Sequence, residues 1–124
     1  MSFPEESTIC AIATAPGRGG VGIVRISGAK TKFISRKILG FKPKTRHAHA
    51  CKFLDDDGST IDTGIAIFFK GPSSYTGEDI LELHGHGSRP LLNETIKRVL
   101  HLGAEMARPG EFTERSFLNG KMDL

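Results

Sequence analysis

Two charged residues stand inside otherwise apolar, strand-like stretches of the chain. Glu82 interrupts the apolar run at 79–84, and Arg25 interrupts the one at 21–27. Side chains of a strand alternate between two faces, so Glu82 is expected opposite the more apolar face. Most residues of this kind have no binding function. The Glu then faces solvent or forms a salt bridge, and the Arg extends to water or pairs with an anion. The functional alternative for Glu82 is a fixed acceptor for paired N–H donors, such as those of a pterin or guanine edge.

His84 and His86 are candidates for a metal pair. Residues two apart point to the same side of an extended segment, and Glu82 lies on that side too. Two histidines are too few for a closed site, and glycine-flanked histidines at a strand end are more often hydrogen-bonded turn residues. No metal site is therefore predicted, and the spacing of the remaining residues assembles no catalytic triad.

Residues 17–22 satisfy the G-x-G-x-x-G spacing of a dinucleotide fingerprint. That fingerprint needs a helix to open at the third glycine, whereas the β-branched residues at 23–27 favour a strand. We therefore predict a tight loop between two strands. No segment supplies a Walker A loop, so this chain alone is not expected to bind GTP.

A dense series of charges surrounds the last predicted helix. Its members are Arg108, Glu111, Glu114, Arg115 and Lys121. The series is interpreted as a solvated face with pairs four residues apart, such as Glu111 with Arg115. Phe112, Phe117 and Leu118 are expected to point inward.

The elements that must position these residues follow from periodicity and from glycine and proline punctuation. Strands are predicted at 8–14, 21–27, 48–54, 63–70, 79–84 and 104–107, the third and fourth forming a hairpin. Helices are predicted at 31–39, 89–102 and 111–119, the second with His101 on its apolar side. The order indicates an α+β or α/β chain. We commit to an α+β fold with a mixed β-sheet and two to three packed helices.

Composition sets limits on the class of protein. A chain of 124 residues with 38% hydrophobic and 25% charged residues is typical of one soluble domain, here residues 1–124. There is no secretory signal and no apolar run that could span a membrane, so a cytoplasmic, non-membrane protein is expected. The net charge of +3 permits contact with nucleic acid, although the basic run at 42–47 is interpreted as a solvated loop. Cys10 and Cys51 are expected to be reduced and packed.

Three long segments resemble, in order, the motifs of the MnmE/TrmE family of tRNA-modification GTPases. The first is 13–28, the second combines 74–79 with 81–87, and the third is 108–124. Together they span nearly the whole chain, and 31–63 is the part least marked by the pattern. Ser88 stands where the family pattern suggests another glycine, which makes this loop slightly less permissive.

The resemblance implies a homodimerising N-terminal domain, similar to folate-binding aminomethyltransferase domains, that binds 5-formyl-tetrahydrofolate or a related reduced folate. It implies a longer parent in which a helical domain and a GTPase domain follow, and the end of the chain without a polar tail agrees with that expectation. The parent would hydrolyse GTP with Mg²⁺ and K⁺ and modify the wobble uridine of tRNA with a flavoprotein partner of the MnmG/GidA type. The fragment itself is expected to be non-catalytic.

The same resemblance assigns folate contacts to Arg25, Glu82 and Lys121. Weaker candidates are Gly85, Gly87, Arg108 and Asn119. Two alternatives stay open: a stand-alone metal-dependent enzyme using Glu82, His84 and His86, and a dimerisation scaffold without a ligand.

Overall fold

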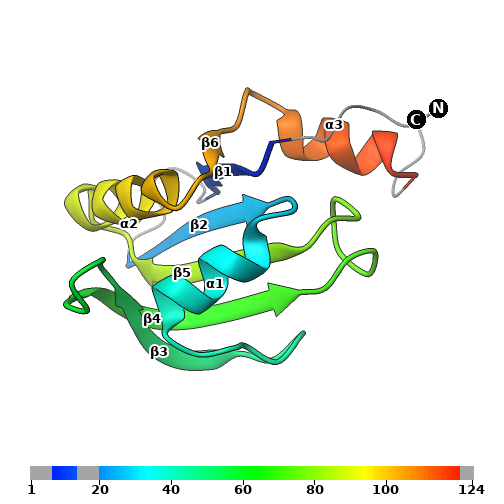
Figure 1. Cartoon of the computed structure of the whole chain (residues 1–124). Coiled ribbons are helices and arrows are strands. Elements are labelled where there is room, and N and C mark those ends of the chain that lie inside the picture. The colour runs from blue at the N-terminus through cyan, green and yellow to red at the C-terminus, as the bar shows by residue number, and fades with distance from the viewer. Residues whose placement is uncertain (1–6, 14–19, 121–124) are drawn as a thin grey trace.

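The described part of the chain forms one six-stranded sheet with three helices (Figure 1). The computed structural model describes residues 7–13 and 20–120. The strands are β1 (Ile9–Ile12), β2 (Val21–Ser27), β3 (His49–Leu54), β4 (Thr60–Phe69), β5 (Ile80–His86) and β6 (Glu105–Met106). They lie in the order β3-β4-β5-β2-β1-β6. Neighbours are antiparallel except β1 and β6, which are parallel, so the sheet is mixed and the α+β prediction is confirmed.

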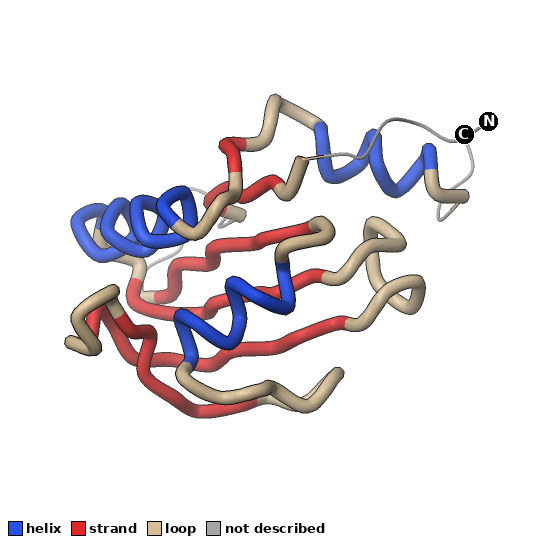
Figure 2. Tube along the Cα trace, in the orientation of Figure 1, coloured by secondary structure: helices blue, strands red, loops and turns tan. Residues whose placement is uncertain are grey.

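The helices begin and end at residues that favour those positions. Helix α1 (Thr31–Leu39) ends at Gly40, which takes the left-handed conformation with φ of 79°. Helix α2 (Arg89–His101) begins after Ser88, whose Oγ accepts a hydrogen bond of 3.3 Å from the Leu91 N–H. Helix α3 (Glu111–Leu118) lies at the other end of the molecule from α2 (Figure 2). None of the helices in the described part of the chain is long and apolar enough to cross a membrane.

The two faces of the sheet differ in what covers them. Helices α1 and α2 pack on one face, where Ile34, Ile38 and Val99 meet the alternate strand residues. Those strand residues are Cys10, Val24, Ile26, Ala66, Phe68, Leu81 and Leu83. The opposite side chains make up what we call the open face: Val21, Ile23, Arg25, Ile65, Ile67, Glu82 and His84. Alternation therefore places the two charged residues away from the main core, as predicted.

Most element boundaries agree with the sequence-based expectations to within a few residues. The β-branched segment at 23–27 belongs to strand β2 rather than to a helix, as the argument against a dinucleotide fingerprint required, whereas most of the predicted loop before it lies outside the described residues. Strands β3 and β4 form the predicted hairpin. The expectation that His101 belongs to the apolar side of α2 is wrong, because His101 is exposed near the end of the helix.

The orientation of α3 differs from the prediction. Phe117 and Leu118 are exposed, at 43% and 45%, whereas Glu111 and Arg115 are buried, at 6% and 2%. The predicted pair of Glu111 with Arg115 exists, with Nη2 and Oε2 3.2 Å apart, but it is not on a solvated face. A buried ion pair is tolerated when further side chains complete the hydrogen bonds of its charged groups.

Those partners come from β2 and from the 71–79 loop. Arg115 Nη1 lies 3.2 Å from both carboxylate oxygens of Glu78. Glu78 Oε1 also accepts a hydrogen bond of 2.8 Å from Ser27 Oγ, which lies 2.7 Å from Thr76 Oγ1. Arg115 therefore joins α3 to a strand and a loop that are distant in sequence.

Glu111 is held as a carboxylate by the same arrangement. Burial alone would raise the pKa of Glu111, but the hydrogen bond from the Arg108 backbone N–H and the guanidinium groups of Arg108 and Arg115 outweigh it. The net result is a pKa below the ordinary glutamate value. The charged form of Glu111 is thus the form that stabilises the attachment of α3.

Replacing Arg115 by Met is expected to destabilise the fold by about 3–5 kcal/mol, because two carboxylates would then face each other without their shared cation. Urea unfolding followed by circular dichroism measures the loss. Arg108→Met is the matched control, since Arg108 also contacts Glu111 but has a side chain 68% exposed, and it should change stability little. Equal losses in the two variants would contradict a special role for the buried cation.

Stability should also depend on Glu111 in acid. A lowered folded-state pKa contributes stability that is complete above the unfolded value, about 4.3, and disappears as the pH falls through the folded value. The difference in unfolding free energy between the native chain and Glu111→Gln should therefore be largest near neutral pH and shrink below about pH 4. Urea titrations at several pH values between 7 and 3 test this, and a difference that stays constant to pH 3 would argue against it.

Candidate functional site

The open face carries a compact polar cluster in the middle of the sheet. Arg25 on β2 lies directly opposite Glu82 on β5, and Ile67 on β4 lies opposite Glu82 on its other side. Residues opposed in this way bring their side chains close together on one face. The cluster therefore results from strand order and register rather than from local sequence.

Each oxygen of the Glu82 carboxylate has its own partner. Oε2 lies 3.0 Å from Arg25 Nε and 2.9 Å from Arg25 Nη2, and Oε1 lies 2.9 Å from His84 Nε2. We call Arg25, Glu82 and His84 the Glu82 cluster. Their side chains are 29%, 17% and 28% exposed, so the cluster is partly desolvated yet reachable from solvent.

Helix α3 contributes an aromatic ring to this cluster. The Arg25 guanidinium carbon lies 5.7 Å from the centre of the Phe112 ring, within the range of a cation–π contact. Phe112 is half-buried, so the prediction that it points inward is confirmed, and it forms an apolar border beside Arg25. No local pattern predicted this contact, because it joins the first and last parts of the chain.

The two histidines of the 84–86 segment have separate partners. His84 contacts Glu82, whereas His86 Nδ1 lies 2.6 Å from Asp62 Oδ1 and its backbone N–H donates to Asp62 Oδ2 at 2.9 Å. Asp62 is buried; burial would raise its pKa, but the hydrogen bonds from His86 and the Thr63 N–H lower the pKa overall. Within 7–13 and 20–120, no three metal-ligating side chains converge. His84 is thus paired with Glu82 and His86 with Asp62, so Glu82, His84 and His86 do not come together as the metal site considered from the sequence.

Gly85 and Gly87 are close to other parts of the chain itself. A side chain at Gly85 would collide with the Asp62 carboxylate and approach the Phe53 ring. Gly87 lies against the Val21 backbone, and its N–H donates to the Gly20 carbonyl at 3.2 Å. Both glycines thus have a structural use on this sheet, and a contact of either with folate stays a prediction.

The remaining predicted residues lie on or after α3. Asn119 Nδ2 donates to the Thr76 carbonyl at 2.8 Å, and Arg108 pairs with Glu111 and Glu114. No hydrogen bond or ion pair in the described ranges joins either residue to the Glu82 cluster. Lys121 lies outside the described residues. Among the residues predicted to contact folate, Arg25 and Glu82 are therefore the two that the structure brings together.

Sequence reasoning missed the residues that hold α3 beside the cluster. Tyr75 Oη lies 3.0 Å from Thr113 Oγ1, and the Tyr75 carbonyl accepts a hydrogen bond of 2.7 Å from Ser116 Oγ. With the Asn119 bond, these contacts fix α3 against the 71–79 loop. The hydroxyl-bearing residues on both segments were a signal, but only the fold shows that they face each other.

Comparison with known proteins gives the family. The family model described as "GTP-binding protein TrmE N-terminus" matches residues 8–121. The chain is 58% identical over 122 residues to the tRNA modification GTPase MnmE of Coxiella burnetii (strain RSA 493 / Nine Mile phase I), covering 98% of this chain and 26% of that protein. It is 55% identical over 122 residues to the MnmE protein of Stutzerimonas stutzeri (strain A1501), again covering 98% of this chain and 27% of the relative.

A third MnmE protein, from Methylococcus capsulatus, is 54% identical over 124 residues, which is 100% of this chain and 28% of that relative. The chain thus spans about a quarter of the length of these relatives. Because the family match extends from β1 to the residue after Gly120, it includes the whole sheet and all three helices. The chain belongs to the family of TrmE N-terminal domains.

Proposed function

We propose that this chain is a tetrahydrofolate-binding and homodimerising domain of a cytoplasmic GTPase that modifies the wobble uridine of tRNA. The observation that carries the folate part is the Glu82 cluster, a carboxylate and a guanidinium held together on the open face. The relatives are named tRNA modification GTPases, which supports the assignment of the parent's activity. GTP, Mg²⁺ and K⁺ would be bound in the parent's GTPase domain, and a MnmG/GidA-type flavoprotein would be its partner on tRNA.

The residues of the cluster fit a flat heterocycle with paired N–H donors. A carboxylate offers about four lone-pair positions, and Arg25 and His84 occupy three of those of Glu82. A pterin that presents two N–H groups therefore has to displace one of these partners. Such an exchange favours a ligand that also carries hydrogen-bond acceptors, because these acceptors can bind the guanidinium displaced from Glu82.

Arg25 is placed to make that exchange. Its Nε and Nη2 contact Glu82, whereas Nη1 makes none of the hydrogen bonds found in the described part of the chain. The guanidinium can turn toward a carbonyl or carboxylate of the ligand while keeping its contact with the Phe112 ring. Lys121 would add a second cation to the ligand, and Gly85, Gly87, Arg108 and Asn119 remain candidates for lining the site.

The apolar part of the open face supports the proposed homodimer. Val21 is 49% exposed and Ile65 is 37% exposed, and both lie on the same face as the Glu82 cluster. Helices α1 and α2 cover the other face, so a second copy is the partner that would remove these residues from water. The two proposed folate sites of a dimer would then lie at or near its interface.

Substitution of Glu82 by Gln should weaken binding of 5-formyl-tetrahydrofolate by about tenfold or more, since a hydrogen bond to a charged group contributes about 1.5–3 kcal/mol. Isothermal titration calorimetry of the purified chain measures the affinity. Glu94→Gln on α2 is the matched control, because Glu94 is exposed and lies outside the cluster. Binding that is absent from the native chain, or equal in both variants, would rule out this folate site.

Substitution of Ile65 by Lys should convert a dimer into monomers, because a charge on the apolar part of the open face cannot be buried without a partner. Sedimentation velocity of the native chain and the variant reports the mass directly. Phe33→Lys introduces the same charge at a position that is 51% exposed on α1 and should leave the dimer intact. A monomeric native chain, or dissociation by both variants alike, would exclude the open face as the interface.

A further inference from the structure

A long segment in the first part of the chain carries only positive formal charges. Residues 7–54 contain no Asp or Glu. Over the same span stand the cations Arg18, Arg25, Lys30, Lys32, Arg36, Lys37, Lys42, Lys44, Arg46 and Lys52. The net charge of the whole chain is only +3, so the acids that balance this region lie in other segments. Charge asymmetry of this kind is typical of a chain that meets a polyanion.

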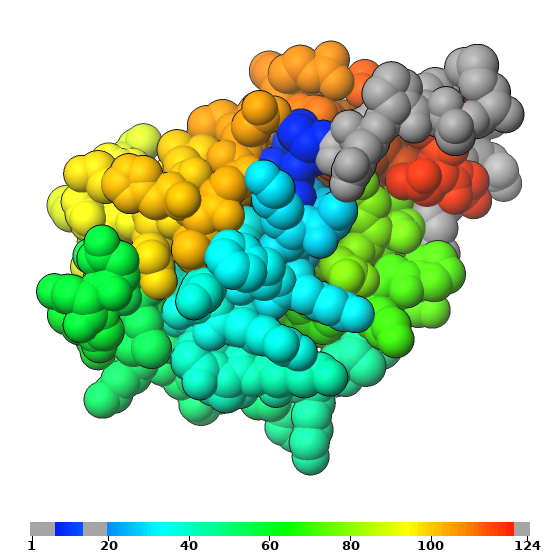
Figure 3. Space-filling view, in the orientation of Figure 1, coloured from blue at the N-terminus to red at the C-terminus, as the bar shows by residue number. Residues whose placement is uncertain are grey.

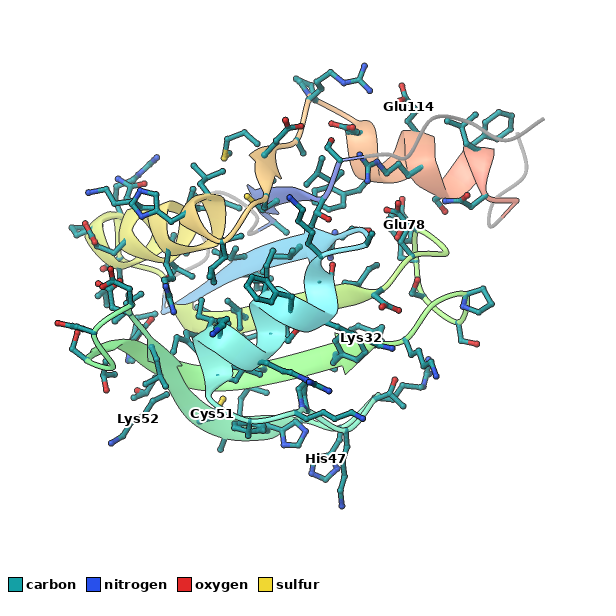
Figure 4. The ribbon with its side chains drawn as sticks, in the orientation of Figure 1. Lys32, His47, Cys51, Lys52, Glu78 and Glu114 are labelled. Atoms are coloured by element: carbon teal, nitrogen blue, oxygen red, sulfur yellow. The ribbon has the colours of Figure 1, made fainter. Side chains whose placement is uncertain are left out.

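The fold concentrates part of this charge at one place. Helix α1 and the segment at 40–48 lie side by side on the face shown in Figure 3, and in Figure 4 Lys32 and His47 mark the helix and the segment. A hollow lies between them. Its lining consists of Lys32, Ser35, Arg36, Lys42, Pro43 and Phe68. Three of these six residues are cationic, and none is acidic.

Among the described residues, no carboxylate pairs with the cations of the hollow. None of the ion pairs formed within residues 7–13 and 20–120 includes Lys32, Arg36 or Lys42. All three side chains belong to exposed residues. They therefore present an uncompensated positive potential to solvent, where an anion with several charges gains from all three at once.

The segment at 40–48 is largely exposed, as expected for the basic run at 42–47, and hydrogen bonds hold its backbone in place. The Arg46 N–H donates to the Phe68 carbonyl at 2.7 Å, and the Lys44 N–H donates to His49 Nε2 at 3.0 Å. Arg46 is held at φ of 59°, a conformation that non-glycine residues adopt at some cost. The basic side chains thus project from a framework tied to strand β4.

Exposed aromatic rings accompany the cations. Phe33 on α1 is 51% exposed and has the Lys37 ammonium 5.8 Å from its ring centre. Phe41 is 38% exposed and packs 5.2 Å from the His49 ring, which in turn lies 4.6 Å from the His47 ring. Flat rings beside basic side chains are what unpaired bases of RNA use for stacking.

The chemistry favours RNA over the other polyanionic surfaces. Insertion into a membrane surface needs a free apolar helix face, and the apolar side of α1, with Ile34 and Ile38, is buried in the core. Interfaces between proteins are depleted in lysine, which is abundant here. We propose that the surface formed by α1 and residues 40–48 binds the phosphodiester backbone of RNA, with phosphate at Lys32, Arg36 and Lys42 and an unpaired base at Phe33 or Phe41.

This surface is separate from the Glu82 cluster, because α1 covers the face of the sheet opposite the open face. That the RNA is a tRNA rests on the proposed function. The binding of RNA itself rests on the charges and rings described above. The two proposals can therefore fail independently.

The test measures fluorescence anisotropy of a labelled, unmodified tRNA transcript titrated with the purified chain at 50 to 200 mM KCl. The hollow variant combines Lys32→Gln, Arg36→Gln and Lys42→Gln. The control variant combines Lys52→Gln, Arg89→Gln and Lys97→Gln, which removes three charges from exposed positions outside the hollow. Figure 4 shows Lys52 projecting away from the region of Lys32 and His47.

The hollow variant is expected to lose at least about tenfold in affinity, and its slope of log K against log salt should fall by about two, since each phosphate contact contributes about 0.7 to 0.9. The control should lose less than about threefold. Absence of tRNA binding by the native chain, or equal losses in both variants, would overturn the proposal. Circular dichroism verifies that both variants remain folded.

Two further measurements separate the remaining explanations. Sedimentation with vesicles that contain phosphatidylserine tests the membrane alternative, and a hollow variant that loses vesicle binding but keeps tRNA binding would overturn the RNA assignment. Calorimetry with 5-formyl-tetrahydrofolate tests the proposed function on the same variant. Retained folate binding with lost tRNA binding supports both proposals. Retained tRNA binding by the hollow variant overturns the RNA proposal whatever the folate result, and absence of folate binding by the native chain overturns the folate site whatever the tRNA result.

Discussion

A buried guanidinium dictates how the end of the chain attaches to the sheet. Arg115 is 2% exposed, and a charge removed from water in this way must be surrounded by acceptors. Glu78 and Glu111 supply them, and Ser27 Oγ, itself hydrogen-bonded to Thr76 Oγ1, donates to the Glu78 carboxylate. One side chain thereby sets the position of α3 relative to β2 and the 71–79 loop. The position of Phe112 over Arg25 follows from that attachment.

The sheet separates two kinds of surface. Its open face has a nearly neutral cluster in which Arg25 and Glu82 satisfy each other, and its helical face has a group of cations without partners in the described residues. The first arrangement suits a small ligand that exchanges hydrogen bonds one for one. The second suits a long polyanion, whose affinity comes from many separated charges. In the proposed function both ligands can be bound at once, because the sheet lies between them.

Local patterns in the sequence were sufficient to predict the elements. Alternation identified β2 and β5, and Gly40 marked the end of α1, because these signals depend on residues close in the chain. The direct pairing of Arg25 with Glu82 could not be predicted from the sequence, although both residues were identified as candidate site residues. It depends on β5 lying next to β2, and that order is set by packing over the whole sheet. The inward side of α3 was mispredicted for a related reason: a charged residue normally faces solvent, and the carboxylate of Glu78, which helps to bury Arg115, is distant in sequence.

The strand order also has a consequence for how the chain acquires its structure. Strands β3, β4 and β5 follow one another in sequence and in space, so their pairings close short loops. Strand β2 instead joins β5, and the paired residues Ser27 and Ile80 are separated by the whole of α1, β3 and β4. Non-local pairings slow folding because the entropy of closing the loop is lost before the contacts form. The β2–β5 pairing is thus expected to form later than the β3–β4 and β4–β5 pairings. During synthesis, β2 remains without this central strand partner until residue 86 has left the ribosome.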